Sequence, residues 1–558
     1  MHMYGSKLLV SVLEDTGVDC AFGLAGSTNL GILDEVAKSD IKFFTTRHEQ
    51  VAAGMATGYA LATRKPTAAI AHVGPGAANM VLGIASAYRE NVPVIAITGN
   101  EPSYNLGRNV KHEWDVLQIF ERITKYNIRM GYDRPQDQIR DAITQSVTGM
   151  PGPVHIDVPH NLENEKFPDL DENVRKKTRM HSYIGSMNRS RPDPIAIDEI
   201  IKLLSNSKNP LLIAGSETRW FDSSEILKKF AESVQIPVAT THNARGILSE
   251  KHPLSIGLVG WIGLKPTNEY LQKSDLVLAI GSSLSDYTTS DWKRIDPAAS
   301  IVHVTMRSRE LNRQYVGDIN ILADPTSTLT DLHNRIKETK KNISFKQISS
   351  KVRNEYASAQ NAVFNVGKPR GETGVDPAPI LQLLDSFAGD YSFVTGGGIH
   401  AKFARHLPVT SINRNFGTLN FSGMGQGLPL GMGAQIALDE QVFVFEGDGG
   451  FAMVMQDLET AVRESIPVKI IIFNNDAYMS QSVRQYREYE GRTTGSVFKN
   501  PDFAAFARDL GMFGESITDN NQVKDTIENF VEVDGPALID AHVDPWIGTE
   551  FLSAELNK

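Results

Sequence analysis

Short apolar runs alternate with helical patterns along this chain and predict a layered fold. Residues 8–13 place apolar side chains at helical spacing, residues 20–23 and 67–71 are typical of short strands, and residues 51–63 are typical of a helix. A further strand is predicted at 92–98. Such alternation indicates right-handed βαβ units, in which helices cover both faces of a parallel sheet.

The same alternation recurs twice more, so we expect an α/β protein with three doubly wound parallel-sheet domains, at residues 1–165, 190–336 and 372–548. Polar segments separate the domains; the second is either a surface helix or a linker that ends in a loop at 367–371. The predicted strands of the second and third domains are 210–214, 237–240, 276–281, 301–305, 319–322, 392–395, 442–445, 469–473 and 537–541.

Composition excludes several classes of function. The 558 residues carry a net charge of −10 without a basic stripe, which argues against nucleic-acid binding. No apolar run reaches the roughly 20 residues that span a membrane, and residues 1–7 lack a secretory pattern, so we expect a cytoplasmic protein. Cys20 lies in an apolar strand, which favours a buried structural thiol over a redox role.

Candidate chemistry gathers near the C-terminal end, where two predicted strands stop at polar residues. Asp448 follows the strand 442–445, and Asn475 follows the strand 469–473. Oxygen ligands at the carboxyl edge of a parallel sheet suit Mg²⁺, which often shares its shell with the phosphates of a bound ligand. An ordinary strand-to-helix turn is the alternative interpretation of this motif.

Three glycines support a phosphate site beside that motif. Gly447, Gly449 and Gly450 let the backbone approach a phosphate group closely and turn amides toward it as a predicted helix at 455–464 begins.

The 27 positions from Asp448 to Asn475 (475 − 448 = 27) resemble the metal and diphosphate motif of the thiamine diphosphate (ThDP) enzymes. The resemblance implies that Asp448, Asn475 and the carbonyl of Ala477 bind Mg²⁺. It covers nearly the whole chain and has the domain order of the acetolactate synthase and benzoylformate decarboxylase group: a pyrimidine-binding, a central and a diphosphate-binding domain.

The resemblance also implies a residue that activates the cofactor. In Arg47-His48-Glu49-Gln50, Glu49 matches the glutamate that binds N1′ of the aminopyrimidine in the family. A carboxylate at the end of a buried strand is costly without a partner, so a structural ion pair with Arg47 is the alternative.

Further cofactor contacts follow from the same resemblance. Met424 matches the apolar residue that supports the bent cofactor, backbone groups of Ser422 and Met424 match those that hold the pyrimidine edge, and His400 matches a histidine that contacts the diphosphate. A lone methionine is otherwise core filler. Ile399 replaces a glutamine that is common in acetolactate synthases.

Departures from the acetolactate synthases point toward a decarboxylase. His72 matches a catalytic histidine of benzoylformate decarboxylase, and Ser27 matches its carboxylate-binding serine. A histidine that titrates near neutrality can protonate a carbanion-like carbon after CO₂ leaves. A buried histidine bonded to the backbone is the alternative for His72.

Two basic positions add to this picture. Lys111-His112 replaces the usual Phe-Gln pair, and Arg484 stands near the position of a tryptophan that would bind a second 2-oxo acid. These changes make the pocket more cationic unless the side chains are exposed, and His112 joins His72 as a candidate for proton transfer.

The first hypothesis is therefore ThDP- and Mg²⁺-dependent carbon–carbon bond cleavage of a 2-oxo acid, most simply non-oxidative decarboxylation through an enamine. The alternative is a carboligase resembling acetolactate synthase, and a third hypothesis is a noncatalytic ThDP-fold binding subunit. FAD is not expected, because residues 257–263 lack the family's histidine and residues 281–284 lack its arginine. The resemblance implies a homodimer or homotetramer with active sites between subunits.

Overall fold

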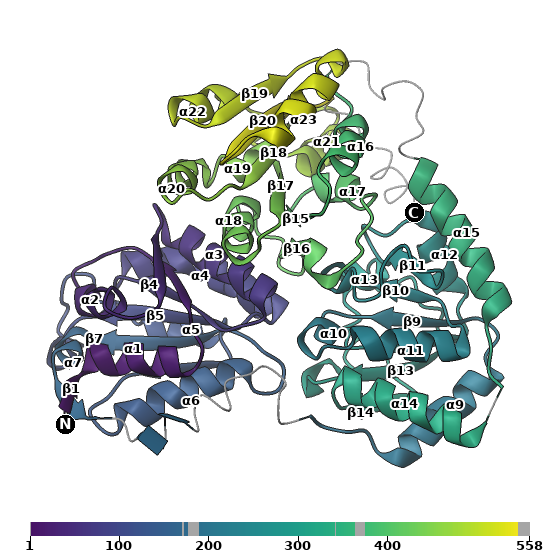
Figure 1. Cartoon of the computed structure of the whole chain (residues 1–558), viewed down its shortest axis with the longest axis horizontal. Helices are drawn as coiled ribbons and strands as arrows, with labels where there is room; N and C mark the ends of the chain where they lie inside the picture. The colour runs from purple at the N-terminus through teal and green to yellow at the C-terminus, as the bar shows by residue number, and fades with distance from the viewer. Residues whose placement is uncertain are drawn as a thin grey trace. The chain divides into compact units, whose positions relative to one another are not determined.

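The computed structural model describes residues 2–169, 172–173, 175–176, 189–340, 342–362 and 374–544 (Figure 1). It divides into two compact units, and each is described by itself. Unit 1 comprises Met1–Met187, Asp390–His400 and Thr418–Leu552, and unit 2 comprises Asn188–Gly389, Ala401–Gly417 and Ser553–Lys558.

The N-terminal part of unit 1 is built on a parallel sheet with the strand order β3-β2-β4-β5-β7-β6. Apolar side chains of its strands, such as Ile70 and Ile97, pack against apolar side chains of the surrounding helices, such as Leu9 and Ile143. A short antiparallel pair joins β1 to β8. The strands are β1 (His2–Tyr4), β2 (Cys20–Gly23), β3 (Lys42–Thr45), β4 (Thr67–Ala71), β5 (Val94–Asn100), β6 (Tyr126–Arg129), β7 (Val154–Pro159) and β8 (Lys166–Pro168).

Helices alternate with these strands, as the hydrophobic pattern predicts. Pro75 stands at the start of α4 and Pro135 at the start of α6, where a missing N–H costs no helical hydrogen bond. The elements are α1 (Gly5–Asp15), α2 (Leu30–Val36), α3 (Glu49–Thr63), α4 (Pro75–Glu90), η1 (Ser103–Asn105), α5 (Val116–Glu121), α6 (Pro135–Val147) and α7 (His160–Glu163).

The C-terminal part of unit 1 carries a second parallel sheet, in which β15, β17, β18, β20 and β19 follow one another. Gly447 at the end of β17 pairs with Phe473 in β18, so the residues after both strands emerge at one edge. The elements are β15 (Tyr391–Thr395), α18 (Gly427–Ala437), β17 (Gln441–Gly447), α19 (Asp448–Phe451), η5 (Met455–Asp457), α20 (Leu458–Arg463), β18 (Lys469–Asn474), α21 (Met479–Glu488), α22 (Phe503–Asp509), β19 (Phe513–Ile517), η6 (Asn520–Gln522), α23 (Val523–Glu532) and β20 (Ala537–His542).

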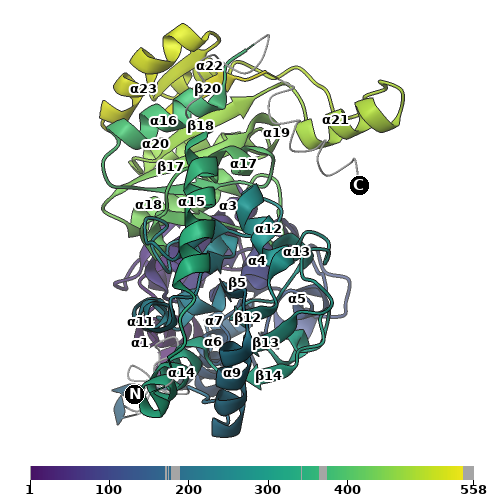
Figure 2. The same ribbon diagram turned by 90° about the vertical axis from the view of Figure 1, so that its right-hand side faces the viewer.

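Glycines allow helices α3 and α18 of unit 1 to pack at very short range. A Cβ on Gly58 of α3 would lie 2.1 Å from the carbonyl oxygen of Leu430, and one on Gly433 of α18 would lie 2.0 Å from that of Met55. The N-terminal and C-terminal sheets of this unit are therefore joined through a close helix–helix contact. Helix α21 extends away from its sheet, as Figure 2 shows.

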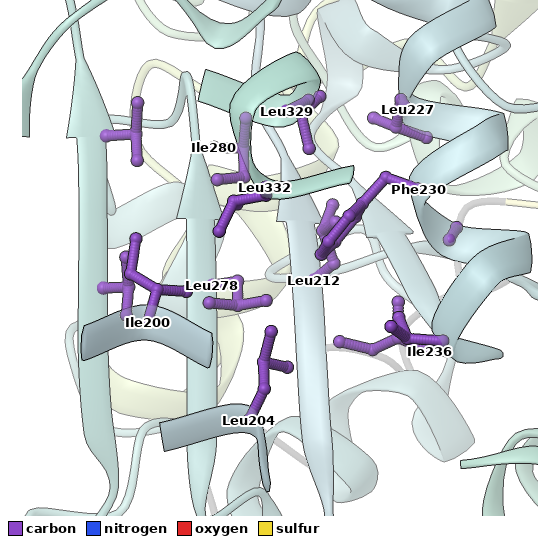
Figure 3. Close-up of a cluster of buried hydrophobic side chains, with 14 of the residues drawn as sticks. Ile200, Leu204, Leu212, Leu227, Phe230, Ile236, Leu278, Ile280, Leu329 and Leu332 are labelled. Atoms are coloured by element: carbon purple, nitrogen blue, oxygen red, sulfur yellow. The ribbon is translucent and has the colours of Figure 1, made fainter. Parts of the chain in front are cut away.

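Unit 2 contains a third parallel sheet, with the order β11-β10-β9-β12-β13-β14. Leu212 and Leu278 point from neighbouring strands into a cluster that includes Phe230, Leu329 and Leu332 from the covering helices (Figure 3). The main elements are α9 (Pro194–Asn206), β9 (Pro210–Ala214), α10 (Glu217–Trp220), α11 (Ser224–Val234), β10 (Val238–Thr240), η2 (His242–Ala244), β11 (Ser255–Leu258), α12 (Lys265–Lys273), β12 (Leu276–Ile280), α13 (Asp286–Thr289), β13 (Ser300–Thr305), η3 (Ser308–Glu310), β14 (Ile319–Leu322), α14 (Pro325–Thr339), α15 (Lys346–Ala362) and α16 (Pro377–Phe387).

The predicted α/β class with three parallel sheets is confirmed. The segment 337–376 contains helix α15, so within the described residues the surface-helix alternative holds there, whereas the predicted loop at 367–371 lies outside the described residues. The predicted domain limits stay predictions, and positions 372–373 and 545–548 also lie outside the described residues. In the part of the chain that the structure describes, no helix has the length and apolarity to cross a membrane.

Candidate active site

Three oxygen atoms face one another at the carboxyl edge of β17 and β18. The side-chain oxygen of Asn475 lies 3.2 Å from Oδ1 of Asp448 and 3.0 Å from the carbonyl oxygen of Ala477. Exchanging the amide nitrogen and oxygen of Asn475 turns both contacts into hydrogen bonds, so Asn475 can donate to Asp448 and Ala477 in the free protein and turn its oxygen toward a cation when one binds.

The spacing of these oxygens fits Mg²⁺. Ligands at 2.0–2.1 Å in octahedral geometry place neighbouring oxygens about 2.9 Å apart, because the octahedral edge is about 1.4 times the metal–ligand distance, and this is close to the distances found here. Asp448, Asn475 and Ala477 therefore fit a magnesium site, and their role as its ligands stays a prediction.

Asn500 supports this oxygen cluster from the loop before α22. Its Nδ2 donates to Oδ2 of Asp448 at 2.7 Å, to Oδ1 of Asn474 at 3.0 Å and to Oδ1 of Asp476 at 3.1 Å. Burial raises the pKa of Asp448 to about 6, while the Asn500 amide opposes that rise. A bound cation would favour the ionised carboxylate further.

Close packing inside the protein explains why glycines stand beside Asp448. A Cβ on Gly449 would lie 2.4 Å from the ring of Tyr478, and one on Gly450 would lie 2.7 Å from Oε1 of Glu446. The helix after the motif begins at Asp448 as α19, and 455–464 divides into η5 and α20, so the expectation of one helix from 455 to 464 is wrong. The chain turns directly from β17 into a helix because these glycines permit tight packing there.

The other predicted cofactor residues have mixed surroundings. Nε2 of His400 lies 3.0 Å from the carbonyl oxygen of Gly396, and burial lowers the pKa of His400 to about 4, so its ring is neutral and bonded to backbone. The backbone N–H of Ser422 donates to Thr418, which leaves the carbonyl of Ser422 as its backbone group for a ligand. Met424 is half-buried. Their roles toward the cofactor stay predictions.

Glu49 is the first residue of helix α3, not the end of a strand. Its Oε2 accepts a hydrogen bond from Nδ2 of Asn79 at 2.9 Å. Arg47 pairs instead with Glu459, through an Nε–Oε2 contact of 2.7 Å, so the alternative of an Arg47–Glu49 ion pair is wrong. Only 8% of Glu49 is exposed, which is low for a carboxylate.

His72 lies between a hydroxyl group and a second histidine. Its Nδ1 is 2.8 Å from Oγ1 of Thr28, and its Nε2 is 3.3 Å from Nδ1 of His112. Desolvation and then the neighbouring His112 lower the pKa of His72. The alternative of a histidine bonded to backbone does not describe His72, whose recorded partners are side chains.

A strained turn carries His112 to this position. His112 has a φ of 69°, and its carbonyl oxygen would lie 2.5 Å from a Cβ on Gly74. The Glu113 carboxylate accepts hydrogen bonds from the backbone of Gly107 and Val110, which lower its pKa and close the turn. The two histidines therefore meet through backbone geometry that only a glycine at position 74 permits.

Three other predicted side chains lie at the surface of this chain. Ser27 and Lys111 are exposed, and Arg484 forms a solvent-exposed pair with Glu488 on α21. For Lys111 and Arg484 this agrees with the solvent-exposed alternative, although the charge of Lys111 is near enough to contribute to the lowered pKa of His72.

Sequence reasoning missed Thr28, Asn79 and Asn500, each of which contacts a predicted site residue. Thr28 follows Ser27 directly, and Asn79 ends the segment that begins with His72, so nearness in sequence was an available signal for both. Asn500 lies 52 positions from Asp448, and no local pattern marks it.

Comparison with known families agrees with this geometry. The description "Thiamine pyrophosphate enzyme, N-terminal TPP binding domain" matches residues 3–119, the central domain of that family matches 197–332, and its C-terminal TPP binding domain matches 396–541. The chain belongs to the thiamine pyrophosphate enzymes.

Individual relatives narrow the comparison. The chain is 31% identical to a probable acetolactate synthase large subunit of Methanococcus aeolicus, over 97% of this chain and 92% of the relative. It is 33% identical to the acetolactate synthase large subunit of Corynebacterium glutamicum, over 97% and 86%. It is 30% identical to that of Lactococcus lactis, over 99% and 96%.

Proposed function

We propose that this chain is a ThDP- and Mg²⁺-dependent carboligase that releases CO₂ from a 2-oxo acid and joins the remaining fragment to a second carbonyl compound. The similarity to acetolactate synthases over 97% of the chain carries this proposal, because it spans all three domains. The proposal reverses the order of the two enzymatic hypotheses drawn from the sequence.

Different residues of the chain would bind the metal and activate the cofactor. Asp448, Asn475 and Ala477 would hold the metal, and through it a diphosphate. Glu49 would exchange a proton with the pyrimidine ring nitrogen. ThDP, when bound, supplies the carbanion chemistry, while the protein selects the carbonyl compounds that enter.

The His72–His112 contact favours a second candidate, non-oxidative decarboxylation to an aldehyde. Two imidazoles 3.3 Å apart can pass a proton between them, and protonation of the substrate carbon would end the reaction without a second carbonyl. In a carboligase, the same two histidines would transfer a proton to the oxygen of the second carbonyl group. Ser27 would receive the substrate carboxylate in either reaction.

The product distinguishes these candidates. The purified chain is incubated with ThDP, Mg²⁺ and a panel of 2-oxo acids, and CO₂ and the organic product are both quantified. A 2-hydroxyketone or 2-hydroxy-2-alkyl-3-oxo acid supports the carboligase, and an aldehyde as sole product supports the decarboxylase. No CO₂ from any acid would contradict both.

The same experiment with Glu49→Gln tests the third hypothesis. We expect the substitution to abolish turnover, because an amide cannot exchange a proton with the ring nitrogen. The family consists of enzymes, so a noncatalytic role would require that Glu49→Gln leave every function of the protein unchanged.

Assembly and the remaining cofactor form a separate part of the proposal. We expect a homodimer or homotetramer, since closed symmetric assemblies are the rule for soluble oligomers and the resemblance implies shared active sites. Light scattering with and without ThDP and Mg²⁺ measures the state; full activity of a monomer would contradict it. We also expect no flavin absorbance in the purified protein.

A further inference from the structure

The two carboxylate oxygens of Glu49 have different surroundings. Oε2 accepts the hydrogen bond from Asn79, with an N–O distance of 2.9 Å. Oε1 faces Gly76, where a Cβ would lie only 2.9 Å away. One oxygen is therefore held by an amide, and the other lies beside a residue that has no side chain to cover it.

Helix α4 fixes the position of Asn79. Pro75 starts the helix, and the N–H groups of Ala77 and Ala78 bond back to His72 and Gly74, so Asn79 lies just beyond a closed first turn. The hydrogen-bonded first turn therefore fixes the position of Asn79 along the axis of α4.

Helix α3, which begins with Glu49, lies close against α4. A Cβ on Gly83 of α4 would lie 2.5 Å from Cβ of Ala53, so the glycine is required for this approach. Both partners of the Asn79–Glu49 bond therefore stand on closely packed helices, which fix the distance between them although the Asn79 side chain is exposed.

A carboxylate at a helix start can rotate about its terminal torsion, which is broad and roughly two-fold. A hydrogen bond to one oxygen selects one orientation of the group. The free oxygen is then presented in a fixed direction, and the absence of a side chain at Gly76 leaves that direction open.

We infer that Asn79 is a positioning residue for cofactor activation: it holds Oε2 of Glu49 so that Oε1 is presented to the pyrimidine nitrogen of the cofactor. The inference rests on the proposed role of Glu49. Asn79 itself does not touch the reacting atoms and moves no proton.

The test measures activation of the cofactor without any substrate. Holoenzyme is mixed with D₂O, quenched in acid, and the exchange of the thiazolium C2 proton of bound ThDP is followed by NMR. We expect Asn79→Ala to slow this exchange about 10-fold, corresponding to about 1.4 kcal/mol. The dissociation constant of ThDP, measured on the same protein, should change less than threefold.

A double-mutant cycle separates positioning from a general structural effect. In the Glu49→Gln background, which itself slows exchange, Asn79→Ala should add no further slowing. Equal slowing by Asn79→Ala in both backgrounds would overturn the inference, as would a normal exchange rate in the single variant.

Two further variants complete the design. Gln145→Ala is the matched control, because Gln145 is an exposed amide that donates to a carboxylate, Asp141, in the same unit. It should leave exchange unchanged. Asn79→Asp keeps the size but replaces the donor with an acceptor, so it should be at least as slow as Asn79→Ala; exchange at the normal rate would overturn the inference.

The outcomes for the two residues stay distinguishable. If Glu49→Gln leaves C2 exchange unchanged, the proposed role of Glu49 fails. If Glu49→Gln slows exchange and Asn79→Ala does not, only the positioning role fails. Asn79 is exposed, so the variant is expected to fold, and its thermal midpoint verifies this.

Discussion

Two carboxylates stand just after parallel strands, at the carboxyl edges of different sheets, and they differ in the groups that face their oxygens. In unit 2, Glu217 follows β9 and accepts hydrogen bonds from Oγ1 of Thr305 at 2.7 Å, the backbone N–H of Met306 at 2.8 Å and Nε of Arg307 at 3.2 Å. In unit 1, Asp448 follows β17, and its Oδ1 faces the oxygen of Asn475.

The difference separates a structural carboxylate from a ligand-binding one. Glu217 is fully buried, and donors at the end of β13, two strands from β9, satisfy both of its oxygens. At Asp448, the Asn500 amide and the Ala477 N–H donate to Oδ2, whereas Oδ1 faces the Asn475 amide, whose oxygen can turn toward a cation. A fold with similar sheets thus uses the same position for stability in one domain and for binding in another, in line with the rule that function belongs to sites rather than folds.

Substituting Asp448 should produce the largest effect. Asp448→Asn removes the negative charge from the three-oxygen cluster, and we expect the affinity for Mg²⁺ in the presence of ThDP to fall by about 1000-fold or more, equivalent to about 4 kcal/mol. Isothermal titration measures the affinity. Retention of metal affinity within tenfold would show that the cluster is not the metal site.

Substituting Glu217 should reduce stability and leave cofactor binding unchanged. Glu217→Gln removes one of the two buried carboxylates that pair with Arg307 and leaves Glu310 as the other, so we expect the unfolding free energy of unit 2 to fall by about 3 kcal/mol, the low end for breaking a buried ion pair. Urea unfolding measures this loss. The affinity for ThDP should stay within twofold, and a large loss of cofactor binding would contradict the structural role.

The hydrophobic pattern predicted the inner strands better than the edges of the sheets. The bounds of the inner strands β2, β4 and β9 agree with the prediction to the residue, as do those of the edge strand β14. Among the missed strands, β3, β6 and β19 lie at sheet edges and carry partly exposed side chains, whereas β7 is a buried inner strand. An edge strand has a neighbour on one side only, so its sequence needs fewer apolar residues.

The site shows a similar division. The resemblance found Asp448, Asn475 and Ala477, because a strand, a turn and a second strand bring them together in a fixed order. It missed Asn79, for which nearness to His72 was the available signal but whose bond to Glu49 depends on the packing of α3 on α4. It also missed Asn500, which reaches Asp448 from a distant loop. Contacts of this kind depend on tertiary structure, and local residue spacing does not encode them.

A third buried carboxylate sharpens the comparison through its pH dependence. Glu163 is fully buried; its Oε2 accepts from the Gly31 N–H at 3.1 Å and lies 3.6 Å from Nδ1 of His160, and burial raises the pKa of Glu163 to about 8. Because the folded-state pKa is above the unfolded value of 4.5, the fold is favoured below pH 4.5 and loses this stability as the pH rises toward 8.

Glu163→Gln removes that titration. Relative to the variant, the wild type should lose about 2 kcal/mol of unfolding free energy between pH 5 and pH 7, within the limit of about 1.4 kcal/mol per unit for one group. Urea unfolding at several pH values measures the difference, and His160→Asn controls for titration of the neighbouring histidine. A constant difference across this range would mean that Glu163 is ionised in the folded protein.

The smallest effect is expected where a neutral side chain supports the charged cluster. Asn500→Ala removes the amide that donates to Asp448, Asn474 and Asp476, but leaves all three predicted metal ligands in place. Loss of such an orienting contact typically costs 10- to 100-fold in metal affinity, and the low end applies here because Ala477 N–H also donates to Asp448, at 3.2 Å.

We therefore expect Asn500→Ala to weaken Mg²⁺ binding about 10-fold, or about 1.4 kcal/mol. A high concentration of Mg²⁺ should restore full ThDP retention in this variant. Asp448→Asn should show no such rescue, because added metal cannot replace the missing charge. If Asn500→Ala bound Mg²⁺ more tightly than the wild type, the amide would be competing with the cation for the Asp448 oxygen. The contrast between Glu217 and Asp448 would then extend to their neighbours: donors that complete a structural carboxylate would obstruct a metal-binding one.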